Sequence, residues 1–217
     1  MRTLSSIEEL PFATAARSAP VVVQPASDHA LLQGTLDGDE DAFAELVRRY
    51  RNQITSYIYR MTNDYDGAVD LAQETFLRVY RAAARYQTTH AFSTYIYRIA
   101  TNVAISELRK RKRRRLVSLT GLLTSGDGQE PRDFDAPDEH PLQDVSLVDS
   151  ERRQVVKRAI STLPEKYRAP LVLRDVEGKS YDEIAAILRT SEGTVKSRIN
   201  RARNFLRDKM RSYVQVV

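Results

Sequence analysis

Apolar side chains recur at steps of three and four residues between positions 39 and 115, which is the spacing of one face of an α-helix. The run NDYDG interrupts this pattern, and Asp66 is the predicted N-cap of a second helix. A third helix is expected from about Ser93 to Arg115, after the loop RYQTTHAFS. The inward stripe of the first helix is Phe43, Leu46, Val47, Tyr50, Ile54, Tyr57, Ile58 and Met61, and that of the second is Val69, Ala72, Phe76 and Tyr80. Three helices with short connections predict an all-α module.

A second helical pattern begins near residue 150. The segment STLPEKYRAPLVLRDVEG predicts a helix that stops at Gly178, with Pro170 either kinking it or marking a later start. Ser180 and Glu183 have the spacing of a capping box for the next helix, SYDEIAAIL. After the turn RTS, Ser191 is expected to cap a final helix whose inward stripe is Val195, Ile199, Ala202 and Leu206. The pattern predicts a helix-turn-helix.

The remaining segments lack helical periodicity. Residues 116–150 are rich in Gly, Pro and acidic residues, which predicts a disordered linker. Three prolines in the first 25 residues predict a flexible leader, which also lacks the long apolar stretch of a signal peptide. The expected organisation is all-α, with two small helical domains joined by a flexible acidic linker. Its boundaries are a leader at 1–30, a first domain at 31–115, the linker at 116–149 and a second domain at 150–217.

Charge follows these divisions. The 217 residues carry a net charge of +5, but residues 1–115 hold 17 Lys and Arg against 13 Asp and Glu. Residues 116–150 hold 1 basic and 8 acidic residues, and residues 151–217 hold 16 basic and 8 acidic residues. This basic, acidic, basic order favours polyanionic partners for the two domains. The chain has no cysteine, which excludes disulfides and thiolate chemistry, and no apolar run long enough for membrane insertion.

The final helix, SEGTVKSRINRARNFLR, is unusually basic. With its apolar stripe inward, the polar residues Thr194, Lys196, Ser197, Arg198, Asn200 and Arg201 are left near the helix start or on the other faces. Such side chains bind phosphates and base edges, although they would also suit a solvated or partner-binding helix. The short capped helix and tight turn that precede it favour docking on DNA.

Two further segments bear on nucleic-acid binding. The run RKRKRRR, residues 109–115, suits a phosphate-binding tail or a solvated helix end. The segment FSTYIYRIATN mixes Tyr95 and two other aromatic residues with Arg98 and Asn102. Aromatic rings beside a cation and an amide suit stacking on unpaired bases. Aromatic residues at helical spacing are nevertheless more often part of a core.

The motifs DGDEDAFAELVRRYRNQI, DLAQETFLRVYRAAARY, FSTYIYRIATNVAISELRKRKRR, LPEKYRAPLVLRDVEGKSYDEIAAIL and GTVKSRINRAR occur in that order. This order resembles bacterial sigma factors of the extracytoplasmic-function (ECF) group over about residues 35–115 and 150–210. The resemblance implies a cytoplasmic, nucleoid-associated protein that binds the β′ and β subunits of core RNA polymerase. Such a protein directs polymerase to promoter DNA, helps to melt it, and is commonly held by an anti-sigma factor.

The resemblance also implies roles for particular residues. The polymerase-binding face would contain Asp70, Gln73 and Glu74. The loop RYQTTHAFS would capture a flipped base of the −10 element, and the −10 contacts would come from Tyr95, Arg98, Asn102, Arg109 and Arg111. The −35 contacts would come from Thr194, Lys196, Ser197, Arg198, Asn200 and Arg201. The acidic linker would thread through polymerase.

Two other functions compete with this interpretation. A stand-alone helix-turn-helix regulator would explain the second domain, but not the DLAQE face or the two-domain layout. A hydrolase acting on nucleic acid is disfavoured, because His29, His90 and His140 lie in segments expected to be loops or flexible. No carboxylate cluster has metal-ligand spacing either. The expectation is therefore a protein that is not an enzyme and has no cofactor or metal.

Overall fold

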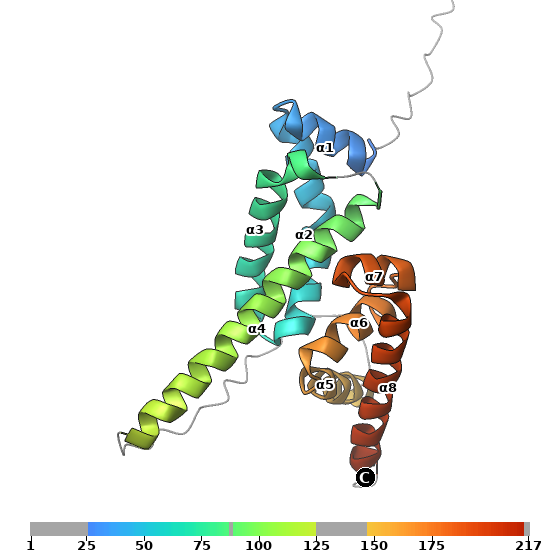
Figure 1. The fold of residues 1–217 in the computed structure, drawn as a ribbon. Coiled ribbons are helices and arrows are strands. Elements are labelled where there is room, and N and C mark those ends of the chain that lie inside the picture. Colours follow the sequence, from blue (N-terminus) through green and yellow to red (C-terminus); the bar gives the residue numbers. More distant parts are fainter. Residues whose placement is uncertain (1–25, 87–88, 125–146, 215–217) are drawn as a thin grey trace, which may run out of the picture.

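The computed structural model describes the backbone of residues 26–86, 89–124 and 147–214, and this part of the chain is helical throughout (Figure 1). The all-α prediction is confirmed. Most of the expected leader and most of the expected linker lie outside the described residues. The elements are α1 (Asp28–Leu36), α2 (Glu40–Thr62), α3 (Tyr65–Arg81), the 3-10 turn η1 (Ala83–Arg85), α4 (Phe92–Thr124), α5 (Leu147–Ser161), α6 (Glu165–Asp175), α7 (Tyr181–Leu188) and α8 (Glu192–Val214).

The first module contains α1 to α4, and its core follows the predicted stripe of α2. Leu46, Ile54, Tyr57 and Ile58 are fully buried. The predicted inward stripe of α3 was partly wrong, because Tyr80 is 54% exposed and Val79 is fully buried in its place. Ala72, Phe76 and Val79 follow steps of four and three residues, so Val79 continues the inward face and Tyr80 falls beside it.

The start of α3 differs from the sequence prediction. Asp64, rather than Asp66, is the N-cap: its backbone is extended, and its side chain accepts a hydrogen bond of 3.0 Å from the amide of Gly67. Asp66 lies in the first turn, where a negative charge favours the helix dipole without capping it. Asn63 adopts the left-handed conformation at the end of α2, so the two helices are separated by a two-residue turn.

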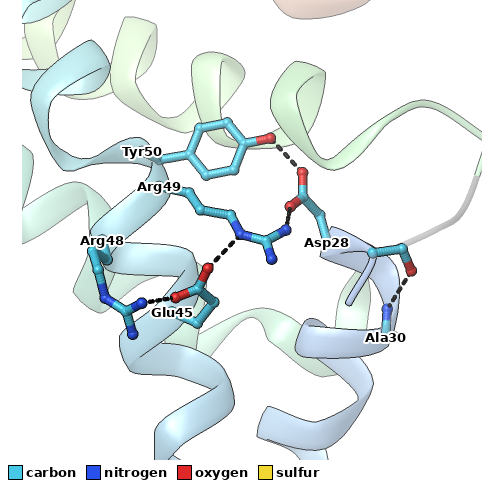
Figure 2. A network of polar contacts seen from close by, with 7 residues as sticks. Asp28, Ala30, Glu45, Arg48, Arg49 and Tyr50 are labelled. Atoms are coloured by element: carbon cyan, nitrogen blue, oxygen red, sulfur yellow. Dashed lines mark hydrogen bonds and ion pairs between the residues drawn. The ribbon is translucent and has the colours of Figure 1, made fainter. Parts of the chain in front are cut away.

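Helix α1 was not predicted, since it is short and its first residues lie in the segment assigned to the leader. Ser27 caps it by accepting from the Ala30 amide at 3.2 Å, and Leu32 is buried. Figure 2 shows how its first residue, Asp28, meets α2: one carboxylate oxygen accepts from Arg49 at 2.9 Å, and the other accepts from the hydroxyl of Tyr50. Polar contacts to α2 therefore hold this helix together with the burial of Leu32.

Removing the Tyr50 hydroxyl is expected to destabilise the first module. The substitution Tyr50→Phe keeps the ring but removes a donor to a charged acceptor, which should lower the free energy of unfolding by about 1 kcal/mol. Urea denaturation followed by circular dichroism measures this change. Tyr80→Phe is the matched control, because its exposed hydroxyl has no described bond, and a change within about 0.5 kcal/mol is expected. Equal effects of the two substitutions would contradict the prediction.

Helix α4 is longer than predicted. It begins at Phe92 and continues to Thr124, beyond the expected end at Arg115 and into the segment assigned to the linker. The residues that follow Arg115, LVSLTGLLT, include no proline and only one glycine, so nothing in their chemistry stops a helix. The basic run 109–115 consequently lies inside a regular helix, with further helical turns after it.

The second module contains α5 to α8, and the predicted helix-turn-helix is present in α7 and α8. Both bonds of the capping box form: the Ser180 amide donates to Glu183 at 2.8 Å, and the Glu183 amide donates to the Ser180 hydroxyl at 3.1 Å. Pro170 lies inside α6, so that helix does not begin after it. Gly178 has φ +69°, a conformation that favours glycine, where the chain leaves α6.

The two modules pack against each other. Helix α7 lies against α4, and α5 and α6 lie against α2 (Figure 1). Arg168 of α6 is 8% exposed and crosses this boundary, because its guanidinium donates to the carbonyl of Met61 at the end of α2. It also donates to the carbonyls of Ser161 and Leu163, the latter at 2.8 Å.

Candidate nucleic-acid and polymerase interfaces

The N-terminal half of α8 presents polar side chains to solvent because its apolar stripe is buried. Val195, Ile199 and Ala202 are almost fully buried, and these three positions fix how the helix is rotated. Ser191 caps the helix by accepting from the Thr194 amide at 3.3 Å. Thr194 and Arg198 are half-buried, and the other predicted −35 residues, Lys196, Ser197, Asn200 and Arg201, are exposed. Thr194, Ser197, Arg198 and Arg201 line one cavity, whereas Lys196 lies elsewhere on the helix and pairs with Glu192 at 3.4 Å.

A cavity of about 390 Å³ lies beside the start of α8. Its walls combine Ser197, Arg198 and Arg201 with Lys166 and Tyr167 of α6. A hydrogen bond with Arg201 lowers the pKa of the Tyr167 hydroxyl, and the charge of Lys166 acts in the same direction. The cavity is therefore strongly cationic and suits a phosphate. Sequence reasoning missed Lys166 and Tyr167, because no pattern links α6 to a helix that starts 25 residues later.

On α4, the predicted −10 residues divide into buried and exposed groups. Tyr95 is 7% exposed, and its hydroxyl donates to the carbonyl of Ala82 at 3.2 Å. Its ring lies 5.1 Å from that of Tyr86, and the guanidinium of Arg98 lies 5.3 Å from its centre. Burial raises the pKa of the Tyr95 hydroxyl. Asn102 is exposed beside these residues, so Arg98 and Asn102 form the accessible part of this group.

Thr94 is a candidate that sequence reasoning missed. It is 4% exposed, and its hydroxyl is buried without a hydrogen-bond partner. It lines a cavity of about 60 Å³ whose other walls are Arg85, Tyr86, Thr89, His90, Tyr95 and Arg98. A buried hydroxyl without a partner is costly for a folded protein and is often found at sites that accept a ligand. Its position inside FSTYIYRIATN was the only available signal.

The two arginines of the basic run that are predicted −10 contacts differ in their surroundings. Arg109 is exposed and lies 3.5 Å from Glu165 of the second module. Arg111 is half-buried and donates to Asp64 at 2.6 Å and to Glu107 at 3.0 Å. The bond to Asp64, the N-cap of α3, fastens α4 to the start of that helix, whereas the bond to Glu107 lies within α4. Arg109 is thus available to a phosphate at little cost, whereas Arg111 would have to leave two carboxylates.

Helix α3 carries the predicted polymerase-binding residues on its outer surface. Asp70 and Gln73 are exposed, and Glu74 pairs with Arg78 at 2.8 Å. The next exposed position along this surface is Leu77, an apolar side chain. A surface that combines carboxylates and an amide with an exposed apolar side chain suits a protein partner.

Neither metal binding nor membrane crossing has support in the described part of the chain. No group of three or more His, Asp or Glu side chains there could hold a metal ion. No helix among those residues is long and apolar enough to cross a membrane.

Comparison with protein families agrees with this geometry. The Sigma-70 region 2 family matches residues 46–114, which hold the α3 and α4 faces. The family of Sigma-70, region 4, matches residues 153–206, which hold the helix-turn-helix. Together they cover more than half of the chain and define a protein of the sigma-70 class. Within that class, the chain belongs to the ECF RNA polymerase sigma factors, as its curated relatives establish.

Three relatives illustrate this membership. The chain is 36% identical over 183 residues to the ECF sigma factor SigW of Bacillus subtilis, covering 80% of this chain and 91% of the relative. It is 35% identical over 194 residues to the ECF sigma-E factor of Escherichia coli, covering 87% and 97%. It is 38% identical over 175 residues to SigE of Mycolicibacterium smegmatis, covering 79% of this chain but only 63% of that longer protein.

Two solved structures share the fold. CnrH, in complex with the cytosolic domain of CnrY, has a TM-score of 0.62 at 20% identity, covering 86% of this chain and 99% of that chain. The sigma factor RpoE, in complex with the anti-sigma factor NepR from Bartonella quintana, has a TM-score of 0.59 at 24% identity. This second match covers 78% of the present chain and 96% of RpoE.

Proposed function

We propose that this ECF-type sigma factor binds the β′ and β subunits of core RNA polymerase, directs the enzyme to promoters and helps to open them. The observation that carries this proposal is the presence, in one chain, of an acidic and apolar α3 face and two separate cationic faces. A stand-alone helix-turn-helix regulator needs only the α8 face. The α3 face, with Asp70, Gln73 and Glu74, is assigned to the polymerase.

The α8 face is assigned to the −35 element. A helix in the major groove reads base edges with arginine, asparagine or serine side chains, and the half-buried Arg198 and the exposed Asn200 would supply such contacts. Lys196 and Thr194 lie closer to the helix start, where cations and backbone amides bind phosphate. The cationic cavity next to Arg201 would hold a phosphate of the same strand and fix the helix in register.

The α4 face is assigned to the −10 element. Asn102 and Arg98 are accessible to an unwound strand, and Arg109 lies further along the same helix for its phosphates. The cavity beside Thr94 would take the edge of a flipped base, with the Tyr95 and Tyr86 rings as its wall. Flipping a base costs a few kcal/mol, and stacking plus a hydrogen bond to Thr94 would offset that cost.

This role of Thr94 predicts opposite effects on stability and base selection. Thr94→Val should raise the free energy of unfolding by about 1 kcal/mol, because it removes a buried hydroxyl that has no partner. The same change should reduce discrimination at one −10 position about tenfold, because the pocket loses its polar group. Urea denaturation and transcription from promoters varied at single positions measure the two effects.

Thr101→Val provides the matched control. Its buried hydroxyl donates to the Tyr97 carbonyl at 2.6 Å and bonds the Tyr57 hydroxyl at 2.8 Å. Removing it should lower stability by about 1 kcal/mol and leave base discrimination unchanged. A loss of stability in Thr94→Val, or unchanged discrimination, would contradict the assignment of Thr94.

The proposal has three further parts. An anti-sigma factor is expected as a partner, because related folds are known in complexes with such proteins. The site of action is the nucleoid, where polymerase and promoters meet. The chain would act through binding alone, without a catalytic residue, cofactor or metal of its own.

Transcription with purified components tests the proposed function. Core polymerase with the full-length chain is supplied with a randomised promoter library, and the transcribed templates are sequenced. Selective initiation at templates sharing two separated elements is the expected result. Initiation no more selective than that of core polymerase alone, together with specific binding of the chain to duplex DNA, would instead favour the stand-alone regulator.

A further inference from the structure

Gly67 lies in the first turn of α3, and its φ is not one of the positive values that favour glycine. Glycine is also a poor helix former, so its presence in this helix needs another reason. A Cβ atom at this position would overlap the Oδ2 atom of Asp64 and lie 2.9 Å from the Nη2 atom of Arg111. The lack of a side chain at Gly67 therefore leaves room for a carboxylate and a guanidinium to meet.

Asp64 and Arg111 join two helices in this space. The Oδ1 atom of Asp64 accepts from the Gly67 amide at 3.0 Å and caps α3, while its Oδ2 atom accepts from Arg111 at 2.6 Å. Arg111 also donates to Glu107, one turn earlier in α4, at 3.0 Å. Burial alone would raise the pKa of Asp64, but the bonds from Gly67 and Arg111 bring it below its usual value. The residue that starts α3 thus holds a cation of α4.

This contact lies where α4 leaves the core of the first module. Ala104 is the last buried residue of α4 among the side chains that the structure describes. Ile105 and Leu108 are half-buried, and Figure 1 shows the helix continuing beyond α2 and α3. At 1.5 Å per residue, Arg113 lies about 14 Å past Ala104, and a tilt of about 15° at Ala104 would move it by about 3.5 Å. A bond that fixes the direction of α4 at Arg111 therefore controls where the neighbouring side chains lie.

One side of α4 carries a row of exposed polar side chains, here called the polar row. Its members are Asn102, Ser106, Arg109 and Arg113. At about 100° per residue, the four positions fall within about 60° of one another around the helix axis. The first three also line a single cavity, which agrees with their common side. Arg111 follows Asn102 by nine residues, so it lies about 180° away and faces α3 instead.

We propose that Asp64, Gly67 and Arg111 form a clamp that sets the direction of α4, and that this clamp aligns the polar row with the phosphates of one DNA strand. Ser106 and Arg113 are thereby assigned as further DNA contacts, and Arg111 is a positioning residue rather than a contact. Because α3 carries the polymerase-binding face, the clamp also keeps that face and the polar row at one angle. This inference rests on the proposed function for the identity of the bound strand.

Spin labels measure the clamp in the absence of DNA. The chain has no native cysteine, so Gln53→Cys on α2 and Lys112→Cys on α4 give two exposed labelling sites. Double electron–electron resonance should give a narrow distribution of distances between the labels. Asp64→Ser should broaden it about twofold, because the end of a rod amplifies any tilt at its base. A serine still caps α3 through its hydroxyl but provides no carboxylate for Arg111. An unchanged width would overturn the clamp.

Binding of the holoenzyme to DNA tests the alignment. The probe is a fluorescent forked DNA that carries the −10 element of a promoter selected from the randomised library, and the sigma factor is in excess over core polymerase. Asp64→Ser removes a negative charge and frees Arg111, so general electrostatics predict tighter binding. The clamp predicts the opposite. Binding should be about tenfold weaker, and the slope of log affinity against log salt should be shallower by about 0.7 to 0.9, because Arg113 loses its phosphate. Equal or tighter binding would overturn the alignment.

Three further variants identify the cause. Gly67→Ala changes no charge and should act as Asp64→Ser does, because its Cβ atom displaces the clamp. Arg113→Ala should weaken binding similarly but add little to Asp64→Ser, since the contact is already lost. Asp66→Ser removes the same charge from an exposed position in the same turn of α3, so the distances and the affinity should stay unchanged. Additive losses in the double variant, or an equal loss in Asp66→Ser, would overturn the clamp as the cause.

The clamp and the proposed function can fail separately. Thermal denaturation verifies that each variant remains folded. Failure of the unsubstituted chain to direct selective initiation would overturn the proposed function, and with it the DNA contacts assigned to the polar row. The label distances, which are measured without DNA or polymerase, test the clamp alone.

Discussion

Arg198→Ala is expected to reduce transcription from a promoter with a −35 element at least tenfold, with polymerase binding unchanged. Arg198 of α8 is half-buried and lines both the cationic cavity at the helix start and a cleft shared with Asn102 and Arg109 of α4. A bidentate arginine contact to a base is worth about 1–3 kcal/mol of discrimination. Single-round transcription, together with gel-shift titration of the holoenzyme on variant −35 elements, measures the loss and its base dependence.

Arg207→Ala is the control for this prediction. Arg207 is exposed on the same helix, nine residues further on, and donates to Asn204 at 3.2 Å. The two substitutions remove the same charge, so a general electrostatic role would give similar losses and similar changes in salt dependence. Equal losses would therefore contradict base reading by Arg198. A large loss confined to Arg198→Ala, with relaxed preference at one −35 position, is the expected outcome.

Arg168→Met is expected to lower the free energy of unfolding by about 3 kcal/mol, the largest stability effect predicted for a single substitution. Its guanidinium donates to the carbonyls of Met61, Ser161 and Leu163, and the substitution leaves these acceptors without a donor. Burial lowers the pKa of Arg168, which reflects how far its charge is removed from water. Urea denaturation of the full chain measures the change.

Arg158→Met is the matched control, since Arg158 is exposed in the last turn of α5. The free energy of unfolding of this variant is expected to change by no more than about 1 kcal/mol, because only the interaction of Arg158 with the helix dipole is lost. Arg168→Lys should recover only part of the lost stability, because an ammonium does not reproduce the planar fork of a guanidinium. Full recovery by lysine would show that charge, rather than the three directed bonds, accounts for the effect.

Much of the fold could be predicted from the sequence, because helical periodicity and cap chemistry point to the same elements that the buried side chains define. The stripe of α2 and the capping box at Ser180 follow from helical periodicity and cap chemistry, and both are present. Helix α1 could not be predicted, since Asp28 is held by Arg49 and Tyr50, more than 20 residues away in the sequence. The cap at Asp64 was missed because two aspartates flank Tyr65 and both suit a helix start.

Only some residues of the candidate sites could be predicted from the sequence. The α8 residues could be assigned because a regular stripe of buried side chains fixes which face is outward. The sequence left two roles open for Tyr95, a core residue or a ring that stacks on bases. In the structure Tyr95 is 7% exposed, and it also lines the cavity beside Thr94. Thr94 and Tyr167 could not be predicted from the sequence. The unpaired hydroxyl of Thr94 and the lowered pKa of Tyr167 both depend on neighbours that are brought close only by tertiary packing.

The length of α4 has a mechanical consequence. At 1.5 Å per residue, its 33 residues form a rod of about 50 Å, and the basic run lies on the same rod as Asn102. The distance and rotation between the Asn102 amide and the arginines of the basic run are consequently fixed by the helix. Inserting one alanine between Asn102 and Arg109 would turn the basic run by about 100° relative to Asn102, so that the two would no longer keep their common side of the helix.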